Sequence, residues 1–309
     1  MANVKVGVIG AGWWAVRNHL PVLQSRSDVK VTTVCRLGKE ELRKVQEQFG
    51  IEFATEDYRE LLRHDDLDGV VVSSPHRFHY EHAWAALERG LHVLCEKPMV
   101  LYAREARQLA SQAASKHLHF VVPFGWNYTS LAAEARALVK EGRIGRIEHV
   151  HCHMGSSTRD LFSGEGFWFS NDDAVKPDPR TWSDAAGGGG FAHGQLCHAL
   201  ALLFFITELR ASEVFASTIV SATGADLTVT ISCRFKNGAT GMMGGAGTMP
   251  PRSTYQVDIR YSGPKVCCCW TLKGLASNYT ARTESGGRSP WISSRENTHV
   301  LSRSTLLSI

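Results

Sequence analysis

Glu96 and Lys97, directly before Pro98, are the residues best suited to proton chemistry. The apolar run at positions 92–95 predicts a buried strand that ends at this turn. A lysine held at a strand end, beside a carboxylate and a proline-fixed turn, can transfer a proton or hold a hydroxyl group. By spacing alone, a surface salt bridge explains the Glu-Lys pair equally well.

A second group follows the glycine run 187–190 and contains Gly194, Gln195 and His198. If a helix begins near Phe191, Gly194 and His198 lie one above the other and Gln195 flanks them. This would place an imidazole over a glycine-lined floor. A core histidine on an apolar helix is the alternative, and without further context the sequence favours it.

A third group is a glycine turn after the apolar strand predicted at positions 4–9. Gly10 to Ala15 fit the form G-x-G-x-x-A, which holds a dinucleotide diphosphate at a helix N-terminus. Gly10 permits the tight turn, Gly12 lets the backbone approach the phosphates, and Ala15 permits close packing of helix on strand. We therefore expect nucleotide binding rather than an ordinary glycine turn.

Arg36 follows the second predicted strand, at the position where enzymes that prefer NAD carry a carboxylate. Arginine at this position can hold a 2′-phosphate through charge-assisted hydrogen bonds, and Lys39 is close by. We therefore expect NADP(H) to be preferred over NAD(H). A solvated loop arginine is the alternative.

Residues 73–79 follow the predicted strand 69–72, at the end of the sheet where ligands dock in open α/β folds. The residues expected to bind the coenzyme are Gly10, Gly12, Trp13, Trp14, Arg36, Ser73, Ser74, Pro75, His79, Glu96 and Lys97.

Strands and helices must alternate to position these groups. The pattern up to Pro123 predicts a doubly wound parallel sheet, a Rossmann domain over residues 1–123. Residues 124–309 instead predict an α+β domain with a mostly antiparallel, open sheet and a long loop at 156–190. An open sheet face suggests a homo-oligomer.

Bulk composition excludes several classes of protein. The chain has 309 residues, 43% hydrophobic and 21% charged, which is typical of a globular protein with room for two domains. The net charge of +4 gives no reason to expect nucleic acid or a membrane surface as a partner. We find no spanning apolar run and no secretory signal, and the single cysteines read as reduced, so we expect a cytoplasmic protein.

Together these segments resemble the Gfo/Idh/MocA family of oxidoreductases. The resemblance rests on VGVIGAGWW, SSPHRFHYEHAWAALERGLHVLCEKP and GGGGFAHGQLCHALALLFFIT, and it covers roughly residues 4–262. It implies an enzyme that transfers a hydride between C4 of nicotinamide and a carbon bearing a hydroxyl or carbonyl group. The implied substrate is a sugar, inositol or a related polyol.

The resemblance also implies roles for individual residues. It places Lys97 beside the nicotinamide and substrate, with His198 as partner acid or base. Gly194 stands where the family's D-x-x-x-H arrangement has its aspartate, so His193 or Gln195 would have to replace that group, or the substrate differs. The residues expected to bind substrate are Lys97, Asn127, Trp182, Gln195 and His198. Asn127 is followed by Tyr128, where the family often has a basic residue.

Two other function classes stay open. The missing aspartate at Gly194 is compatible with a non-catalytic nucleotide-binding regulator. A lyase or hydrolase that uses a retained nucleotide in an internal redox cycle is the third alternative.

From about Ser262 the pattern changes. Residues 267–269 are three adjacent cysteines, and the tail to Ile309 shows neither strand nor helix period. Three adjacent positions of a strand cannot all face one ion, so we expect no metal site. Cysteine codons TGC-TGC-TGC encode leucines in a neighbouring frame. We therefore hypothesise that residues 262–309 result from a frameshift, which the nucleotide sequence can test.

Overall fold

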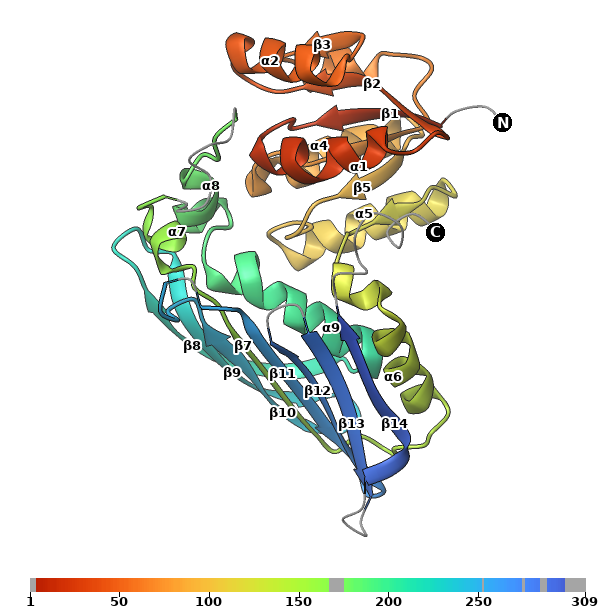
Figure 1. Ribbon diagram of the computed structural model, residues 1–309, viewed down its shortest axis with the longest axis vertical. Helices are drawn as coiled ribbons and strands as arrows, with labels where there is room; N and C mark the ends of the chain where they lie inside the picture. The colour runs from red at the N-terminus through yellow and green to blue at the C-terminus, as the bar shows by residue number, and fades with distance from the viewer. Residues whose placement is uncertain (1–3, 167–174, 252, 274–275, 284–287, 298–309) are drawn as a thin grey trace. The chain divides into compact units, whose positions relative to one another are not determined.

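The computed structural model describes the chain except residues 1–3, 167–174, 252, 274–275, 284–287 and 298–309 (Figure 1). The chain divides into two compact units. The first contains Met1–Pro123, Gly166–Thr181 and Ala186–Gly188, and the second contains the remaining residues. Each unit is described by itself.

The first unit is built on a parallel sheet whose described strands have the order β3-β2-β1-β4-β5-β6. The strands are β1 (Val4–Ile9), β2 (Val29–Cys35), β3 (Phe53–Thr55), β4 (Gly69–Val72), β5 (His92–Cys95) and β6 (Phe120–Val121). The order reverses between β1 and β4, and in open parallel sheets ligands bind outside the carboxyl ends of the strands at such a reversal.

Helices connect these strands. They are η1 (Ala15–His19), α1 (Leu20–Gln24), α2 (Lys39–Phe49), α3 (Tyr58–Leu62), η2 (His76–Phe78), α4 (His79–Glu88) and α5 (Ala103–Ser115). Every residue of β4 is buried, because α4 packs on β4 and β5 while α3 packs on β1. The sequence GVVV suits a strand covered on both faces.

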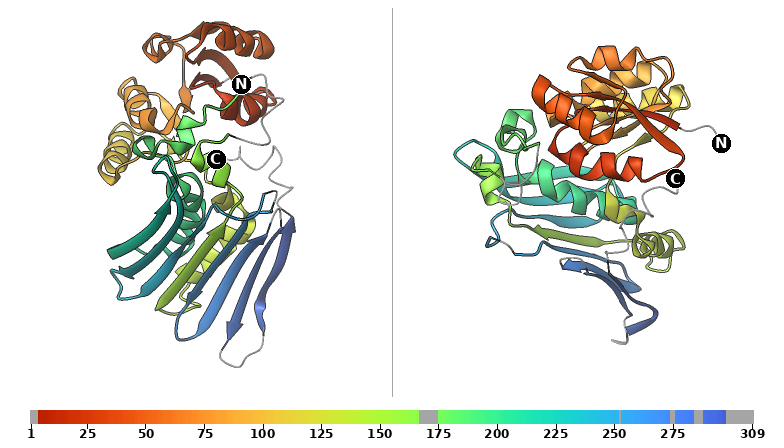
Figure 2. Two further views of the ribbon diagram at one scale, coloured as in Figure 1. Left: turned by 90° about the vertical axis from the view of Figure 1, so that its left-hand side faces the viewer. Right: turned by 45° about the horizontal axis from the view of Figure 1, so that its top comes forward.

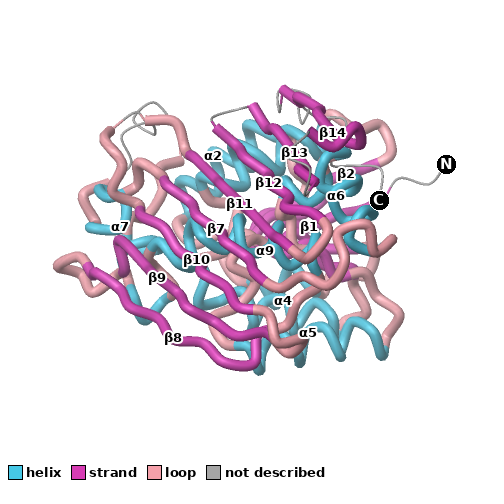
Figure 3. The backbone as a smooth tube through the Cα atoms, turned by 90° about the horizontal axis from the view of Figure 1, so that it is seen from below, coloured by secondary structure: helices cyan, strands magenta, loops and turns pink. Residues whose placement is uncertain are grey.

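The second unit contains a mixed sheet whose described strands have the order β14-β13-β12-β11-β7-β10-β9-β8 (Figure 3). The strands are β7 (His149–Gly155), β8 (Ala211–Val220), β9 (Asp226–Phe235), β10 (Thr240–Ala246), β11 (Gln256–Ser262), β12 (Val266–Lys273), β13 (Ala276–Thr283) and β14 (Arg288–Asn297). Only the pair β7 and β10 is parallel among the described strand pairs of this unit.

One face of this sheet carries α9 (Cys197–Thr207), which packs against β7, β11 and α6 (Ser130–Lys140), as Figure 2 shows. None of the described helices covers the other face, which is called the open face below (Figure 3). In β7, Val150, Cys152 and Met154 are buried, whereas the histidines that alternate with them are exposed or half-buried. Period-two alternation of this kind is the signature of a strand covered on one face.

The remaining helical segments are short. They are η3 (Gly125–Tyr128), α7 (Arg159–Ser163), α8 (Arg180–Ser183), η4 (Ala185–Gly187) and η5 (Ala192–Leu196). Three of them lie within the stretch 156–190 that the sequence suggested was a loop.

The parallel sheet and the mostly antiparallel sheet confirm the fold class. The tail after Ser262 was expected to contain neither strand nor helix. This expectation was wrong, because β12, β13 and β14 extend the second sheet. Backbone hydrogen bonds pair β12 with β11, and such bonds can form whatever the side chains are, because the donors and acceptors belong to the main chain. Within β12, Cys268 and Trp270 are buried while Cys267 is exposed, so the cysteines alternate between the two faces. The frameshift hypothesis stays open.

The expectation that the chain contains no long apolar run was wrong. Residues Ala185–Thr207 have the length and mean hydropathy, 1.4, of a membrane-crossing helix. Half of the most apolar 18-residue window of this stretch is buried inside the fold, where α9 packs on the sheet. Buried core helices pass the same test, so the stretch is weak evidence for a membrane span.

Candidate active site

The glycine turn is pinned between the ends of β2 and β4. The amides of Gly10 and Ala11 both donate to the carbonyl of Cys35, at 2.8 and 3.0 Å. Gly10 has φ of 89°, and a Cβ atom there would lie 2.3 Å from the backbone nitrogen of Ser74. Only glycine fits this position, because both the backbone conformation and the neighbouring chain exclude a side chain.

Gly12 is in a different environment. A Cβ atom at Gly12 would meet only the carbonyl of Gly10, at 3.9 Å, so the space beside this residue is open. A helical segment begins at Trp13, where first-turn amides point along the axis without intrahelical acceptors. An open backbone surface beside a helix N-terminus fits a coenzyme diphosphate. Trp13 and Ala15 are buried behind the turn, and Trp14 is partly exposed.

Arg36 lies at the edge of the same turn. It is half-buried, its Nε donates to the carbonyl of Leu37 at 3.1 Å, and its Nη1 donates to the carbonyl of Ala11 at 3.4 Å. Burial lowers the pKa of this guanidinium, which Glu41 partly opposes. A guanidinium ordinarily titrates above pH 12, so Arg36 stays charged beside the glycine turn.

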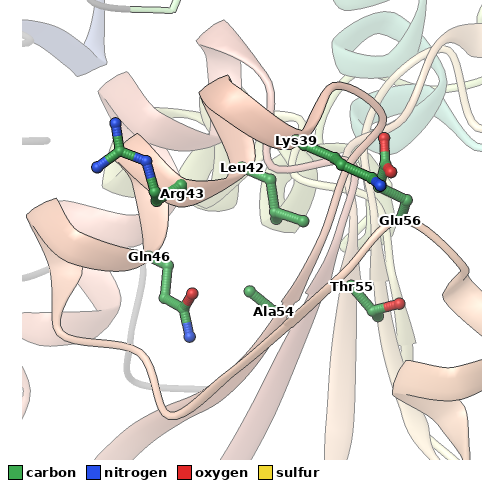
Figure 4. Close-up of a pocket in the computed structure, with 7 residues that line it drawn as sticks. All are labelled: Lys39, Leu42, Arg43, Gln46, Ala54, Thr55 and Glu56. Carbon is green, nitrogen blue, oxygen red and sulfur yellow. The ribbon is translucent and has the colours of Figure 1, made fainter.

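A shallow hollow of about 270 Å³ lies between α2 and the end of β3 (Figure 4). It is lined by Lys39, Leu42, Arg43, Gln46, Ala54, Thr55 and Glu56. Glu56 also accepts a 2.7 Å hydrogen bond from the amide of Gly38. The sequence did not indicate β3 or this carboxylate, because a strand as short as Phe53–Thr55 has too few residues to show a period.

Glu96 is a buried carboxylate with several donors. Its Oε1 accepts from Nε1 of Trp14 at 2.7 Å and lies 2.8 Å from Nε2 of His19. Its Oε2 accepts from the backbone amide of Lys97 at 3.0 Å. Burial by itself raises the pKa of Glu96, but the hydrogen bond and charge of His19, the charge of Lys97 and the Lys97 amide outweigh it and bring the pKa to about 2. Glu96 is therefore ionised at neutral pH.

Lys97 follows at the carboxyl end of β5. Its backbone is held by Glu96, it is half-buried, and its Nζ lies 5.9 Å from the centroid of the Trp14 ring. The lysine therefore lies at the end of the sheet that carries the glycine turn. An ammonium group in this place can hold a hydroxyl group or relay its proton.

The segment after β4 is fixed by two histidines. His79 is almost fully buried, with Nδ1 2.7 Å from the carbonyl of Pro98 and Nε2 2.7 Å from the carbonyl of Ser74. Burial lowers the pKa of His79. His82 Nδ1 lies 2.9 Å from the Ser74 hydroxyl. Ser74 is buried, Ser73 is half-buried and Pro75 is exposed.

In the second unit, aromatic rings surround His198. The ring of Trp126 lies 5.5 Å from that of His198, and Phe124 meets it edge-on at 5.8 Å. Trp126 in turn stacks on Tyr255 at 6.0 Å. His198 is half-buried on the apolar helical segment.

Three further predicted substrate residues belong to this unit. Asn127 carries a buried Oδ1 atom with no hydrogen-bond partner among the described residues. Gln195 is half-buried in η5, one residue after Gly194. Trp182 is half-buried, and its carbonyl accepts from the amide of Gly190 at 2.9 Å.

Two family models match this chain in sequence. The oxidoreductase family model with an NAD-binding Rossmann fold matches residues 4–124, and the GFO/IDH/MocA C-terminal domain model matches residues 132–263. The chain belongs to the Gfo/Idh/MocA oxidoreductase family. This membership confirms the resemblance drawn from the sequence motifs.

Relatives of this family member include sugar dehydrogenases. D-glucoside 3-dehydrogenase of Escherichia coli is 31% identical over 144 residues, covering 47% of this chain and 41% of that protein. D-xylose 1-dehydrogenase (NADP(+)) 2 of Haloferax volcanii is 26% identical over 252 residues, covering 81% and 72%. The chain spans less than half the length of several curated relatives that it matches.

A solved structure of levoglucosan dehydrogenase, in complex with NADH and L-sorbose, has the same fold. Its TM-score is 0.73 at 19% identity, over 96% of this chain and 80% of that one. At this identity the likeness concerns the fold alone.

The sequence analysis missed His19, Trp126 and Asp226. Asp226 Oδ2 accepts from the amide of Ala192 at 2.8 Å and so caps the helical segment that carries His198. Helix capping by a residue far along the chain leaves no local signal. His19 comes four residues after the G-x-G-x-x-A motif, and only its contact with Glu96 reveals a role.

Proposed function

We propose that this protein is an NAD(P)-dependent oxidoreductase that transfers a hydride between nicotinamide and the CH–OH or carbonyl carbon of a sugar, inositol or related polyol. The observation that carries the proposal is the pairing of Glu96 with Trp14 and with the amide of Lys97. These contacts join the helical segment after the glycine turn to Lys97, at the carboxyl end of a strand of the same parallel sheet. The dehydrogenase names of family relatives support the same reaction class.

The bound coenzyme would supply the hydride acceptor or donor at C4 of its nicotinamide. Gly10, Gly12 and the first turn at Trp13 would hold the diphosphate through main-chain amides. The Nζ of Lys97 would hold the substrate hydroxyl and move its proton, with His198 as the second acid or base.

The surroundings of His198 support a sugar or polyol substrate. Trp126 and Tyr255 offer aromatic surface, while Asn127, Gln195 and His198 offer hydrogen-bonding groups. A carbohydrate presents C–H faces and hydroxyl groups together, so apolar and polar contacts of this kind would both be used. We propose Asn127, Trp182 and Gln195 as further substrate-binding residues.

We propose that NADP(H) is preferred over NAD(H). Arg36 stands half-buried at the end of β2 beside the glycine turn, and Lys39 follows in the next helix. A charge-assisted pair with the 2′-phosphate would favour NADP(H). Replacing Arg36 by Asp should reverse the ratio of the two dissociation constants. The matched control is Arg43→Asp, in the neighbouring hollow.

The deciding experiment is a fluorescence titration with NADPH and NADH, followed by turnover with a panel of sugars and polyols. Replacing Lys97 by Met should abolish turnover while the coenzyme dissociation constant stays within about threefold, because the diphosphate contacts remain. Unchanged turnover would remove Lys97 from the mechanism. Lys44→Met, an exposed lysine of α2, is the control.

A regulator that binds nucleotide without turnover is the second candidate. Gly194 favours it, because the usual aspartate of the family is absent there. Tight coenzyme binding without turnover of any panel member, at every pH tested, would support the regulator. Substrate conversion without net change in coenzyme absorbance would instead indicate an internal redox cycle.

We also propose that the protein forms a homo-oligomer through its second sheet. Phe215 of β8 is 74% exposed and Met242 of β10 is 53% exposed. Both pair with Ser232, so they lie in one row on the open face. Phe215→Glu should shift the mass measured by light scattering toward the monomer. Exposed apolar side chains in one row are typical of association surfaces.

We propose a cytoplasmic location. All eight cysteines lie among the described residues and none of them forms a disulfide. Free thiols persist in a reducing compartment. Fractionation of the producing cells checks this location.

A further inference from the structure

The carboxylate of Glu96 connects two loops that are far apart in the sequence. Trp14 Nε1 and His19 Nε2 approach Oε1 from the helical segment after the glycine turn, at 2.7 and 2.8 Å. The amide of Lys97 approaches Oε2 from the other side, at 3.0 Å. Both oxygens are therefore used, and the three donors come from two separate structural elements.

These contacts are shielded from water. The side chains of His19 and Glu96 are 15% and 10% exposed. In such surroundings a hydrogen bond to a carboxylate is stronger than at the surface, and removing one donor leaves a buried charge undersatisfied. The carboxylate would then turn toward other donors or toward water, and the amide of Lys97 would lose its acceptor.

The location of His19 gives this contact a consequence for ligand binding. Gly12 lies seven positions before His19 and directly precedes the helical stretch that contains His19, which runs from Trp13 to Gln24. A stretch that holds the coenzyme diphosphate at its N-terminus is therefore fastened, through His19 and Glu96, to the turn that holds Lys97.

We propose that His19 is a positioning residue, whose hydrogen bond to Glu96 fixes the Lys97 turn against the coenzyme-binding helix. Its effect on catalysis rests on the proposed oxidoreductase function. Its effect on the Lys97 backbone does not, and this difference allows the two proposals to be tested separately.

The experiment compares His19→Leu with His19→Gln in the full-length protein. Leucine removes the donor, whereas the glutamine amide places a nitrogen donor close to the position of Nε2. His119→Leu is the matched control, because His119 is exposed and precedes β6 at the amino end of the sheet. Trp14→Phe tests the second donor and keeps an aromatic ring beside Lys97.

The first readout is hydrogen–deuterium exchange at the Lys97 amide, in protein without coenzyme. His19→Leu should speed this exchange about tenfold, because the amide loses its fixed acceptor. His19→Gln and His119→Leu should exchange at the wild-type rate. Trp14→Phe should speed it as His19→Leu does, because it removes the other donor to Oε1. If the leucine variant does not fold, His19→Ala is measured in its place.

The second readout is steady-state kinetics with the best substrate of the panel. His19→Leu should lower kcat about 10- to 100-fold, because a misplaced lysine slows proton transfer, while the coenzyme dissociation constant changes less than about threefold. His19→Gln should restore kcat. If His19 had only a structural role, His19→Leu would lower thermal stability without lowering kcat selectively over coenzyme binding.

Wild-type exchange in His19→Leu would overturn the proposal, whatever Trp14→Phe shows. Equal kcat in the leucine and wild-type proteins would overturn its catalytic part. If the wild-type protein neither binds coenzyme nor turns over substrate, the proposed function fails, and the exchange measurement still decides whether His19 positions Lys97.

Discussion

The ring of Phe162 occupies the space that a side chain at position 194 would need. A Cβ atom at Gly194 would lie 2.8 and 2.9 Å from Cε1 and Cζ of this ring, and Phe162 is fully buried. The ring also meets Phe191 edge-on, which fixes its position. An aspartate at position 194 would therefore require Phe162 to move.

Gly194→Asp should therefore destabilise the protein and bring no gain in turnover. Overpacking a buried ring and burying a carboxylate together cost on the order of 2–4 kcal/mol. Thermal unfolding measures the loss. Gly125→Ala is the control, because a Cβ atom there meets nothing within 4 Å. The double variant Gly194→Asp with Phe162→Leu should recover part of the stability, and strict additivity of the two changes would contradict this explanation.

Alanine at Gly10 should reduce stability, whereas alanine at Gly12 should reduce coenzyme affinity. Gly10→Ala should lower stability by on the order of 2 kcal/mol or more, because the new methyl group meets the backbone of Ser74 and the residue has positive φ. Gly12→Ala should fold normally and weaken coenzyme binding, because its methyl group enters the open space. Calorimetric unfolding and coenzyme titration of both variants check this. A Gly12→Ala protein with wild-type affinity would argue against a diphosphate at this turn.

His82 should make stability depend on pH between about 6.5 and 4. Burial lowers the pKa of His82 from 6.5 to about 4, so the unfolded chain takes up a proton in this range and the folded protein does not. The contribution of His82 to the free energy of unfolding is therefore fully present above about pH 6.5, its unfolded pKa. The free energy of unfolding falls as the pH drops toward 4, by on the order of 2–3 kcal/mol. Urea unfolding of His82→Asn should show a shallower slope over this range, and His119→Asn should keep the wild-type slope.

Glu96 should make the stability depend on pH in a lower range, between about 4.5 and 2. Its folded pKa of about 2 lies below the ordinary value of 4.5, so its contribution is present above pH 4.5 and is lost as the pH falls toward 2. The contribution is on the order of 3 kcal/mol. Glu96→Gln should be less stable at neutral pH and show a flatter acid limb in urea unfolding. An acid limb identical to that of the wild type would show that Glu96 is not held ionised.

The sequence alone determined the alternation of strands and helices in the first unit, apart from the short strand β3, and it placed the proposed site residues at the ends of strands. Short runs such as Gly69–Val72 are apolar throughout because both of their faces are covered, and glycines mark the turns. Such signals depend only on neighbours along the chain. For the same reason, local sequence patterns were enough to place Gly10, Gly12 and Lys97 at strand ends.

The tertiary structure alone decided which distant residues meet. The contacts of Glu96 with Trp14 and His19 join positions about 80 apart, and Asp226 at the start of β9 reaches Ala192 in η5. Neither contact follows a period of 2 or 3.6 residues, so no local pattern could reveal it. The strands β12, β13 and β14 were missed for a related reason. Their pairing comes from backbone hydrogen bonds with a preceding strand, and these bonds depend on the neighbouring chain rather than on the residues' own side-chain pattern.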